Sequence, residues 1–264
     1  MVKQRIIDVL ESKDRETKLW KTSFLAARMA YEEGKLREAK SLIVKSWHRT
    51  TKISNSHDRT FAEATTLLGH GAILLAEGNL KDARKKIEEA MNRAHTLKDN
   101  AFQEIYAITL RFYADCLIEE EEFKRGEELL LESIKILEDT GVDGALFLAD
   151  SLSDLCSLYL IQGRYSEIED YITTAVSIYR SVKGAEDIDY YRSASINRLV
   201  IEKSNGEEME NIIENTLTRS AYLVSLQHPH MQKFLKRYCH YLTEKGDFEK
   251  IDILHNEFKG AFVK

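Results

Sequence analysis

Short turns recur at a nearly constant interval along this chain of 264 residues. The turn residue is usually a glycine, and in most cases leucine or an aromatic residue follows two places later and opens an amphipathic segment. The turns lie at positions 34, 78, 121, 163, 206 and 246, so they are separated by 44, 43, 42, 43 and 40 residues. A fixed internal period of this length is typical of proteins built from stacked repeats. The spacing predicts six helical hairpins in tandem.

The chain is also poor in the residues that interrupt helices. Its 12 glycines and 1 proline make up roughly 5 % of the residues, where average usage is about 12 %. Because a sheet protein of this size needs many Gly and Pro turns, an all-α fold is favoured. Apolar residues at three- and four-residue spacing give the second segment of each hairpin one apolar stripe. A pair of helices cannot bury such stripes alone, so neighbouring hairpins must stack.

The repeats predict one continuous solenoid over residues 14–264, because no linker rich in Pro, Gly or Ser interrupts them. A short N-terminal helix or cap, residues 1–13, precedes it. The sole proline, Pro229, lies between two hairpins, where the first residue of a helix tolerates proline. The predicted repeats cover residues 14–53, 57–98, 100–141, 144–184, 186–226 and 228–263.

The second hairpin resembles the tetratricopeptide repeat. The residues that match the motif of that family, with its spacing, are Gly78, Leu80, Ala83, Ile87 and Ala90. The period of about 42 residues exceeds the usual 34 of the family and is similar to the extended repeats of kinesin light chains and many bacterial proteins. The resemblance covers about residues 14–262. It implies a right-handed superhelix of antiparallel helix pairs whose first helices line the concave side.

Two hairpins depart from this motif. In the third, Glu121 replaces the turn glycine and Gly126 replaces the alanine that follows it. In the fifth, Met209 stands at the alanine place, and the first helix can be aligned with the motif in two ways.

The charge is unevenly distributed along the chain, which has a net charge of −6. Residues 1–60 carry 14 basic and 8 acidic side chains, whereas residues 101–190 carry 7 and 20. A nucleic-acid-binding protein needs a dominating basic surface, which this pattern lacks. No apolar run is long enough to cross a membrane, and the N-terminus has no secretory signal. Three cysteines in no metal-binding spacing fit a reducing compartment. We expect a soluble, cytoplasmic protein with no nucleic-acid or membrane partner.

The sequence contains no G-x-x-x-x-G-K-[ST], H-E-x-x-H or G-x-S-x-G motif. We therefore expect that the protein is not an enzyme and holds no cofactor or metal. One alternative is a metal site at His228 and His230, with Cys239 and His240 one helix away, although polar residues are common where a helix begins. The three cysteines are explained as small buried residues at places where two helices approach closely.

The concave side carries the candidate binding site, because the resemblance places the first helix of each hairpin there. One end is basic and aromatic, the middle is apolar and the far end is basic again. Such a surface suits an extended or helical peptide with an anionic group and apolar side chains. The candidate partner-binding residues are Lys21, Phe24, Arg28, Tyr31, Leu68, Ala72, Leu75, Arg111, Asp115, Ser153, Ser157, Lys233, Lys236 and His240.

Three further features suggest contacts beyond the packing of the repeats; among them, the N-terminal segment is expected to fold into the groove. The acidic run Glu119–Glu122 falls on the turn of the third hairpin; it is a solvated turn or the head of an acidic surface that attracts a basic partner. The helix over residues 65–76 is apolar almost all round, so either the N-terminal segment or a partner covers it. The N-terminal segment and the last helix, with Phe258 and Phe262, are candidate contacts for a homo-oligomer.

Together these features predict a non-catalytic scaffold or adaptor that binds a partner protein or peptide in its concave groove. The alternative is a regulator that changes conformation when it binds a peptide, similar to the bacterial tetratricopeptide receptors. Those receptors usually carry an added effector domain, and residues 1–13 are too few to form one.

Overall fold

A computed structural model describes residues 14–97, 100–182, 232, 235–236, 238–240, 242–243 and 246–258. Every element in this described part is a helix. The chain falls into two compact units, the first ending at Phe147 and the second beginning at Leu148. The predicted cap at residues 1–13 and the predicted fifth hairpin at 186–226 lie outside the described residues, and the single continuous solenoid stays a prediction.

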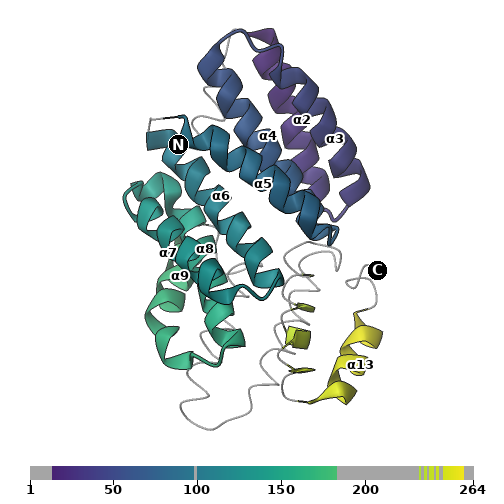
Figure 1. The fold of residues 1–264 in the computed structure, drawn as a ribbon, viewed down its shortest axis with the longest axis vertical. Coiled ribbons are helices and arrows are strands. Elements are labelled where there is room, and N and C mark those ends of the chain that lie inside the picture. Colours follow the sequence, from purple (N-terminus) through teal and green to yellow (C-terminus); the bar gives the residue numbers. More distant parts are fainter. Residues whose placement is uncertain are drawn as a thin grey trace. The chain divides into compact units, whose positions relative to one another are not determined.

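The first unit consists of three helical hairpins (Figure 1). Each predicted turn of this unit, at 34, 78 and 121, separates the two helices of one hairpin; the exact bounds of the repeats stay a prediction. The helices, in pairs, are α2 (Arg15–Glu32) and α3 (Leu36–Thr50), α4 (Ser56–Ala76) and α5 (Leu80–His95), and α6 (Asn100–Glu119) and α7 (Phe123–Glu138). A short 3-10 helix, η1 (Gly141–Gly144), follows α7.

The second unit contains most of the fourth hairpin and the last helix. Its described elements are α8 (Ala145–Ile161), which begins just before the unit boundary, η2 (Tyr165–Glu167), α9 (Glu169–Val182) and α13 (Phe248–Glu257). The fourth hairpin departs from the prediction in one detail, because a 3-10 turn precedes its second helix. Buried Ile168 occupies the place that Ala39 and Ala83 hold in the first two hairpins, and this bulkier side chain accompanies the tighter start.

The turns inside the hairpins share one backbone conformation. Gly34, Gly78, Gly163 and Gly246 have φ between 70° and 77°, and Glu121 has φ 63°. In each turn the following residue donates a backbone hydrogen bond to the carbonyl five residues earlier, as from Asn79 to Leu74 and from Glu122 to Leu117. This pattern is the Schellman motif that ends helices with a left-handed residue. The third hairpin thus keeps the common turn although it lacks the glycine.

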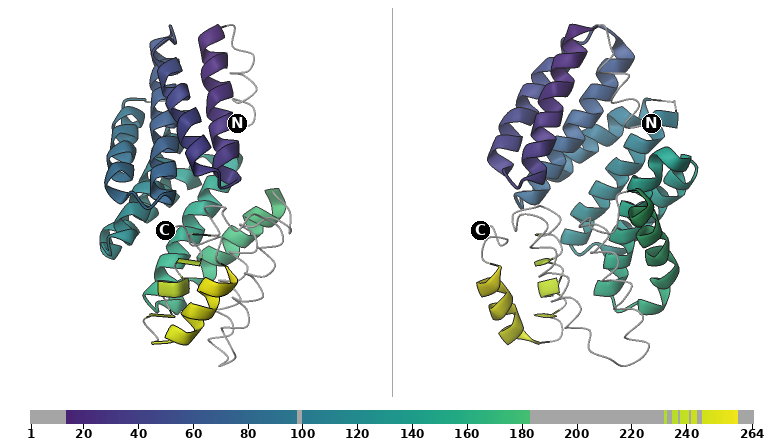
Figure 2. Two further views of the ribbon diagram at one scale, coloured as in Figure 1. Left: turned by 90° about the vertical axis from the view of Figure 1, so that its right-hand side faces the viewer. Right: turned by 180° about the vertical axis from the view of Figure 1, so that it is seen from behind.

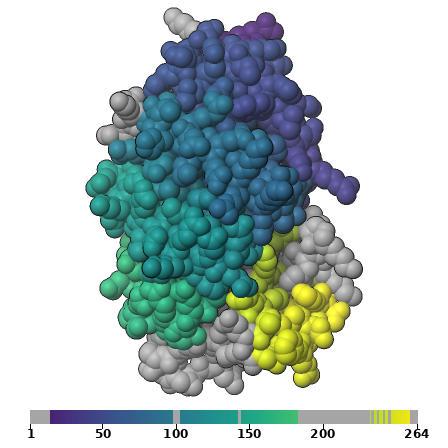
Figure 3. All heavy atoms as spheres, viewed as in Figure 1, coloured from purple at the N-terminus to yellow at the C-terminus, as the bar shows by residue number. Residues whose placement is uncertain are grey.

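The first helices of the three hairpins form one layer, in which α4 contacts both α2 and α6 (Figure 2). Each second helix packs on its own first helix, while α3 also contacts α4 and α5 also contacts α6. Figure 3 shows consecutive hairpins of this unit in close contact along one face. We call the side of the first helices away from the second helices the inner face, and the solvent side of the second helices the outer face.

Small residues allow the close approach of the paired helices. A Cβ atom added at Gly71 on α4 would lie 2.5 Å from Cγ1 of Ile87 on α5. At Gly126 on α7, it would lie 2.8 Å from Cγ1 of Ile118 on α6. The interior between the hairpins is filled by aliphatic side chains and alanine, for example Ala27, Ala39, Ile43 and Ile73 and Leu74, Ala83, Ile87 and Leu117.

Candidate functional site

The repeat assigns matching inner-face places to the first helices, at three, six, ten and thirteen residues before each turn. The structure brings the candidate residues of α2, α4 and α6 together in one layer, because α4 contacts both neighbouring first helices. The predicted residues of this face differ in burial. The buried ones are Lys21, Leu68, Ala72, Arg111 and Asp115. Phe24, Tyr31 and Leu75 are half-buried, and Arg28 is exposed.

Helix α6 carries a row of three buried charged side chains, two of which the sequence predicts for the inner face. Arg111 and Asp115 are 7 % and 3 % exposed, and Glu104, which the sequence interpretation missed, is also 7 % exposed. Steps of seven and four residues place all three on one side of a helix. Each of them has a polar or electrostatic partner. The guanidinium of Arg111 also lies 4.7 Å from the centre of the Phe112 ring.

Helix α2 carries two basic residues that the sequence predicts for the inner face. The Lys21 side chain is 4 % exposed and has a partner. Two turns further on, Arg28 is open to solvent and its Nε lies 2.7 Å from Oε1 of Glu32. This ion pair between exposed groups is weak, since both are hydrated. Arg28 can therefore exchange Glu32 for the carboxylate of a ligand at little cost.

The apolar candidates of the inner face also belong to the hydrophobic core. The Phe24 ring stacks on Trp20 with ring centres 5.9 Å apart, and its Cε2 lies 3.1 Å from the position that a Cβ at Gly69 would take. Leu68 packs in one core cluster and Leu75 against another. These side chains hold neighbouring hairpins together, so their replacement would test stability as well as binding.

The remaining candidates fall in the second unit or outside the described residues. Ser153 and Ser157 are buried on α8, where the Ser157 hydroxyl donates a hydrogen bond to the Ser153 carbonyl over 2.8 Å. Lys236 is exposed and His240 is half-buried. Lys233 lies outside the described residues. The assignment of these residues to one groove with those of α2, α4 and α6 stays a prediction.

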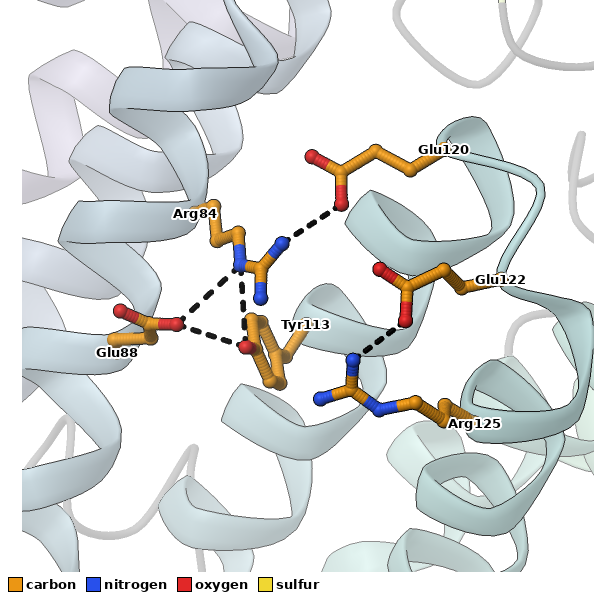
Figure 4. Close-up of polar contacts among 6 residues, drawn as sticks. All are labelled: Arg84, Glu88, Tyr113, Glu120, Glu122 and Arg125. Carbon is orange, nitrogen blue, oxygen red and sulfur yellow. Dashed lines mark hydrogen bonds and ion pairs between the residues drawn. The ribbon is translucent and has the colours of Figure 1, made fainter.

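A polar cluster that the sequence interpretation missed links the second and third hairpins (Figure 4). Nε of Arg84 on α5 lies 3.2 Å from the Tyr113 hydroxyl of α6, and that hydroxyl donates to Glu88 over 2.7 Å. Nη1 of the same guanidinium lies 2.8 Å from Oε2 of Glu120 and forms an ion pair with it. The hydrogen bond to Tyr113 raises the pKa of Arg84 above its ordinary value. Burial raises the pKa of Tyr113, so its hydroxyl stays protonated and continues to donate to Glu88.

The acidic run on the third turn is partly neutralised by this arrangement. Glu120 pairs with Arg84, and Glu122 pairs with Arg125 at 2.5 Å (Figure 4). Glu121 lies between them, exposed to solvent. Two of the four carboxylates of the run are therefore paired in this structure, and whether the turn attracts a basic partner stays a prediction.

The cysteines are buried or half-buried thiols. Cys116 and Cys156 are fully buried, with the Cys156 Sγ 3.8 Å from the Ile168 carbonyl oxygen. Burial raises the pKa of the half-buried Cys239 thiol, which favours its unreactive protonated form. No group of three metal-ligating side chains occurs among the described residues. The alternative metal ligands His228 and His230 lie outside those residues.

At the C-terminal end, Phe258 is buried, 7 % exposed. Phe262 and Val263 lie outside the described residues. None of the helices in the part of the chain that the structure describes combines the length and the apolar character needed to cross a bilayer.

Comparison with known proteins shows the fold. No protein-family model matches the chain, and no curated protein matches it. Among solved structures, aspartyl phosphate phosphatase F from Bacillus subtilis superposes with a TM-score of 0.71 at 12 % identity, covering 97 % of this chain and 62 % of that one. A Rap protein complexed with competence and sporulation factor gives a TM-score of 0.68 at 13 % identity, with coverages of 96 % and 68 %.

A third similar structure carries repeats of the kind that the sequence resembles. The kinesin light chain with nearly identical tetratricopeptide-like repeats from Podosopora anserina has a TM-score of 0.53 at 15 % identity, covering 79 % of this chain and 97 % of that one. These likenesses and the matched hairpin turns show that the chain has a helical repeat fold of the tetratricopeptide type. At such low identity they show the fold alone, and the phosphatase name of the Bacillus protein is not transferred.

Proposed function

We propose, from the tetratricopeptide-type fold as premise, that this chain is a non-catalytic adaptor or regulator that binds a peptide on its inner face. The observation that carries the proposal is the set of charged side chains held there: Lys21 on α2 and Glu104, Arg111 and Asp115 on α6, each at most 7 % exposed. By contrast, the buried polar residues of α3 and α7 are serine or threonine, and α5 has no buried polar residue. Charges are rarely buried without a specific role, because desolvation is costly.

The inner face has the chemistry to select a peptide. Arg28 offers an exposed guanidinium for an anionic group, which binds most strongly when the hydrogen bonds are charge-assisted. In the neighbouring first helices, Leu68 and Leu75 of α4 offer apolar side chains and Arg111 and Asp115 of α6 offer charges of both signs; of these four, Leu75 alone is half-buried and the others are buried. Because α2, α4 and α6 are held in a packed layer, the receptor loses little entropy on binding. A modest contact area is then compatible with micromolar affinity.

A protein of the same fold supports a ligand of this kind, because the Rap protein was solved in complex with competence and sporulation factor. The superposition covers 96 % of this chain at 13 % identity and carries no information on which residues contact the ligand here.

A peptide selected from a random library on the immobilised full chain provides the probe for a direct test. We expect Arg28→Glu and Arg111→Gln each to weaken its binding, measured by calorimetry, about tenfold or more, since one hydrogen bond to a charged group contributes roughly 1.5–3 kcal/mol. Lys52→Glu, an exposed change just after the end of α3, is the matched control and should leave the affinity unchanged. Equal affinity in all three folded variants would refute the inner-face assignment.

The same peptide separates an adaptor from a conformational regulator. Solution X-ray scattering of the full chain with and without saturating peptide measures the radius of gyration. An adaptor keeps its radius, whereas a regulator that changes superhelical pitch becomes more compact. We propose the adaptor mode, because the first unit is bridged between hairpins by buried contacts and by the cluster around Arg84 and Tyr113.

A further inference from the structure

The inner face of α2 is deeply buried near the start of the helix. Lys21, thirteen residues before the turn, is 4 % exposed. In α4, α6 and α8 the same place holds Thr65, Ile108 and Asp150, which are all only half-buried. Yet α2 is the first helix that the structure describes, and the described helices on which it packs are α3 and α4. A lysine at this end of the layer should be the most open of the four, so its burial requires a cover other than these helices.

The cover is confined to the first half of α2. Two turns beyond Lys21 on the same side of the helix, Arg28 is exposed. In α4 and α6 the place of Arg28 holds Ala72 and Asp115, which are both buried. Helix α2 is therefore more open than its neighbours at Arg28, as expected at the end of a layer, and less open than they are at Lys21. The cover lies over the start of α2 and stops before Arg28.

Residues 1–13 form the segment that is joined to the covered place. They lead directly into Asp14, whose side chain caps the start of α2. On a helix, four apolar residues of this segment fall within an arc of about 100°, and they are Val2, Ile6, Val9 and Leu10. Asp8 and Glu11 fall on the opposite side. A helix this short is stable only when its apolar stripe packs on another surface.

Apolar residues that such a stripe can contact lie next to Lys21, at the junction of α2 and α4. Phe24 lies one turn further along α2, and its Cε2 is 3.1 Å from the position that a Cβ at Gly69 on α4 would take. Leu68 precedes this glycine and belongs to the inner face. Thirteen residues in helical form measure about 20 Å, and packed helices lie about 8–10 Å apart. A helix that returns from Asp14 is therefore long enough to cross α2 and reach α4.

We propose that residues 1–13 fold back on the inner face, over the first halves of α2 and α4, and compete there with the peptide. The inference rests on the proposed function, because it names what occupies the same site when no peptide is bound. Arg28 lies outside the cover and is available for the first contact with an anionic group. The rest of the peptide binds only after the segment is displaced, which weakens the apparent affinity in proportion to the docked fraction.

Acetylation of lysines in the full chain, followed by mass spectrometry, tests the cover without any peptide. In the wild type, Lys21 should react slowly compared with the exposed Lys52. I6E/L10E places two charges in the apolar stripe and should speed the reaction of Lys21 about tenfold, if the segment is docked about 0.9 of the time. Q4E/S12E adds the same charge away from the stripe and is the matched control, with no change expected. An unchanged rate at Lys21 in I6E/L10E overturns the proposal.

A synthetic peptide of residues 1–13 provides the complementary test. Added to I6E/L10E, it should restore the slow acetylation of Lys21, whereas the same peptide with both glutamates should not. A short tether supplies an effective concentration of about 1 mM, so a tenfold docking equilibrium corresponds to a Kd of about 0.1 mM for the separate peptide. No protection at about 1 mM peptide overturns the proposal. Protection of the wild type that is lost on dilution also overturns it, because the cover then comes from a second copy.

The library-selected peptide links the segment to the proposed function. I6E/L10E should bind this peptide about tenfold more tightly than the wild type, and Q4E/S12E should bind it like the wild type. Equal affinity in I6E/L10E and the wild type overturns the competition. If Arg28→Glu and Arg111→Gln still weaken binding in that case, the proposed function stands without the competition; if they do not, the proposed peptide site is also wrong. Circular dichroism checks that each variant is folded at the assay temperature.

Discussion

Replacing Glu121 with glycine should stabilise the protein. Glu121 has φ 63°, in the region where Gly34, Gly78 and Gly163 have φ between 70° and 77°. For a residue with a Cβ this left-handed conformation costs roughly 1–2 kcal/mol. Glycine removes this cost, but it also makes the unfolded chain more flexible, which lowers the free energy of unfolding by roughly 0.4–1 kcal/mol. The Glu121 side chain makes no contact that the change would remove within the described residues, so the net gain is about 1 kcal/mol.

Thermal unfolding followed by circular dichroism measures this gain. For a chain of this size 1 kcal/mol corresponds to a rise of about 2–4 °C in Tm. Removing one of four consecutive acidic residues could also stabilise the turn, and Glu121→Ala separates the two causes. Alanine removes the charge and keeps the backbone cost, so it should give little or no rise.

The reverse change provides a second control. An added Cβ at Gly78 would meet nothing within 4 Å, so Gly78→Glu introduces the left-handed cost without steric clash and should lower Tm by a similar amount. If Glu121→Ala raises Tm as much as Glu121→Gly, or if Gly78→Glu is neutral, the reasoning from backbone conformation is wrong.

Three further changes test other contacts. Gly71→Ala should lower the free energy of unfolding by about 1–3 kcal/mol, because the new Cβ overlaps Ile87; equal denaturant midpoints would contradict it. Tyr113→Phe removes the donor to Glu88 and should cost about 1–2 kcal/mol in urea unfolding, with Tyr171→Phe, a change at a half-buried tyrosine of α9, as the comparison that should cost less. Burial and two nearby lysines lower the pKa of His70 in the folded protein. The neutral imidazole therefore contributes to the free energy of unfolding above pH 6.5, and this contribution is lost as the pH falls. His70→Gln should flatten the decline in the free energy of unfolding between about pH 7 and 5.

The hairpin boundaries could be predicted because they depend on local patterns. The spacing of the turns and the apolar stripes locate α2 to α7 without knowledge of any tertiary contact, and even the turn at Glu121 follows from its place in the period. The 3-10 start at Tyr165 could not be predicted, since it accompanies the packing of one bulky residue, Ile168, at a place that the motif gives to alanine.

The candidate site was harder to predict for a physical reason. Periodicity tells which side of a helix Arg111 and Asp115 occupy, but their burial depends on what lies over them. The pattern also missed Glu104, although its position seven residues before Arg111 was a usable signal. The cluster of Arg84, Glu88 and Tyr113 joins residues of two different repeats, so no motif within one repeat indicates it.

The cluster between α5 and α6 has a consequence for how the chain unfolds. A stack in which contacts run only between neighbours behaves like a row of coupled units, and the end with the weakest coupling opens first. Polar bonds from Arg84 to both Tyr113 and Glu120 join the second and third hairpins. Native-state hydrogen exchange should therefore show the amides of α4 to α7 opening with one common free energy. The second and third hairpins would then persist as a single cooperative block.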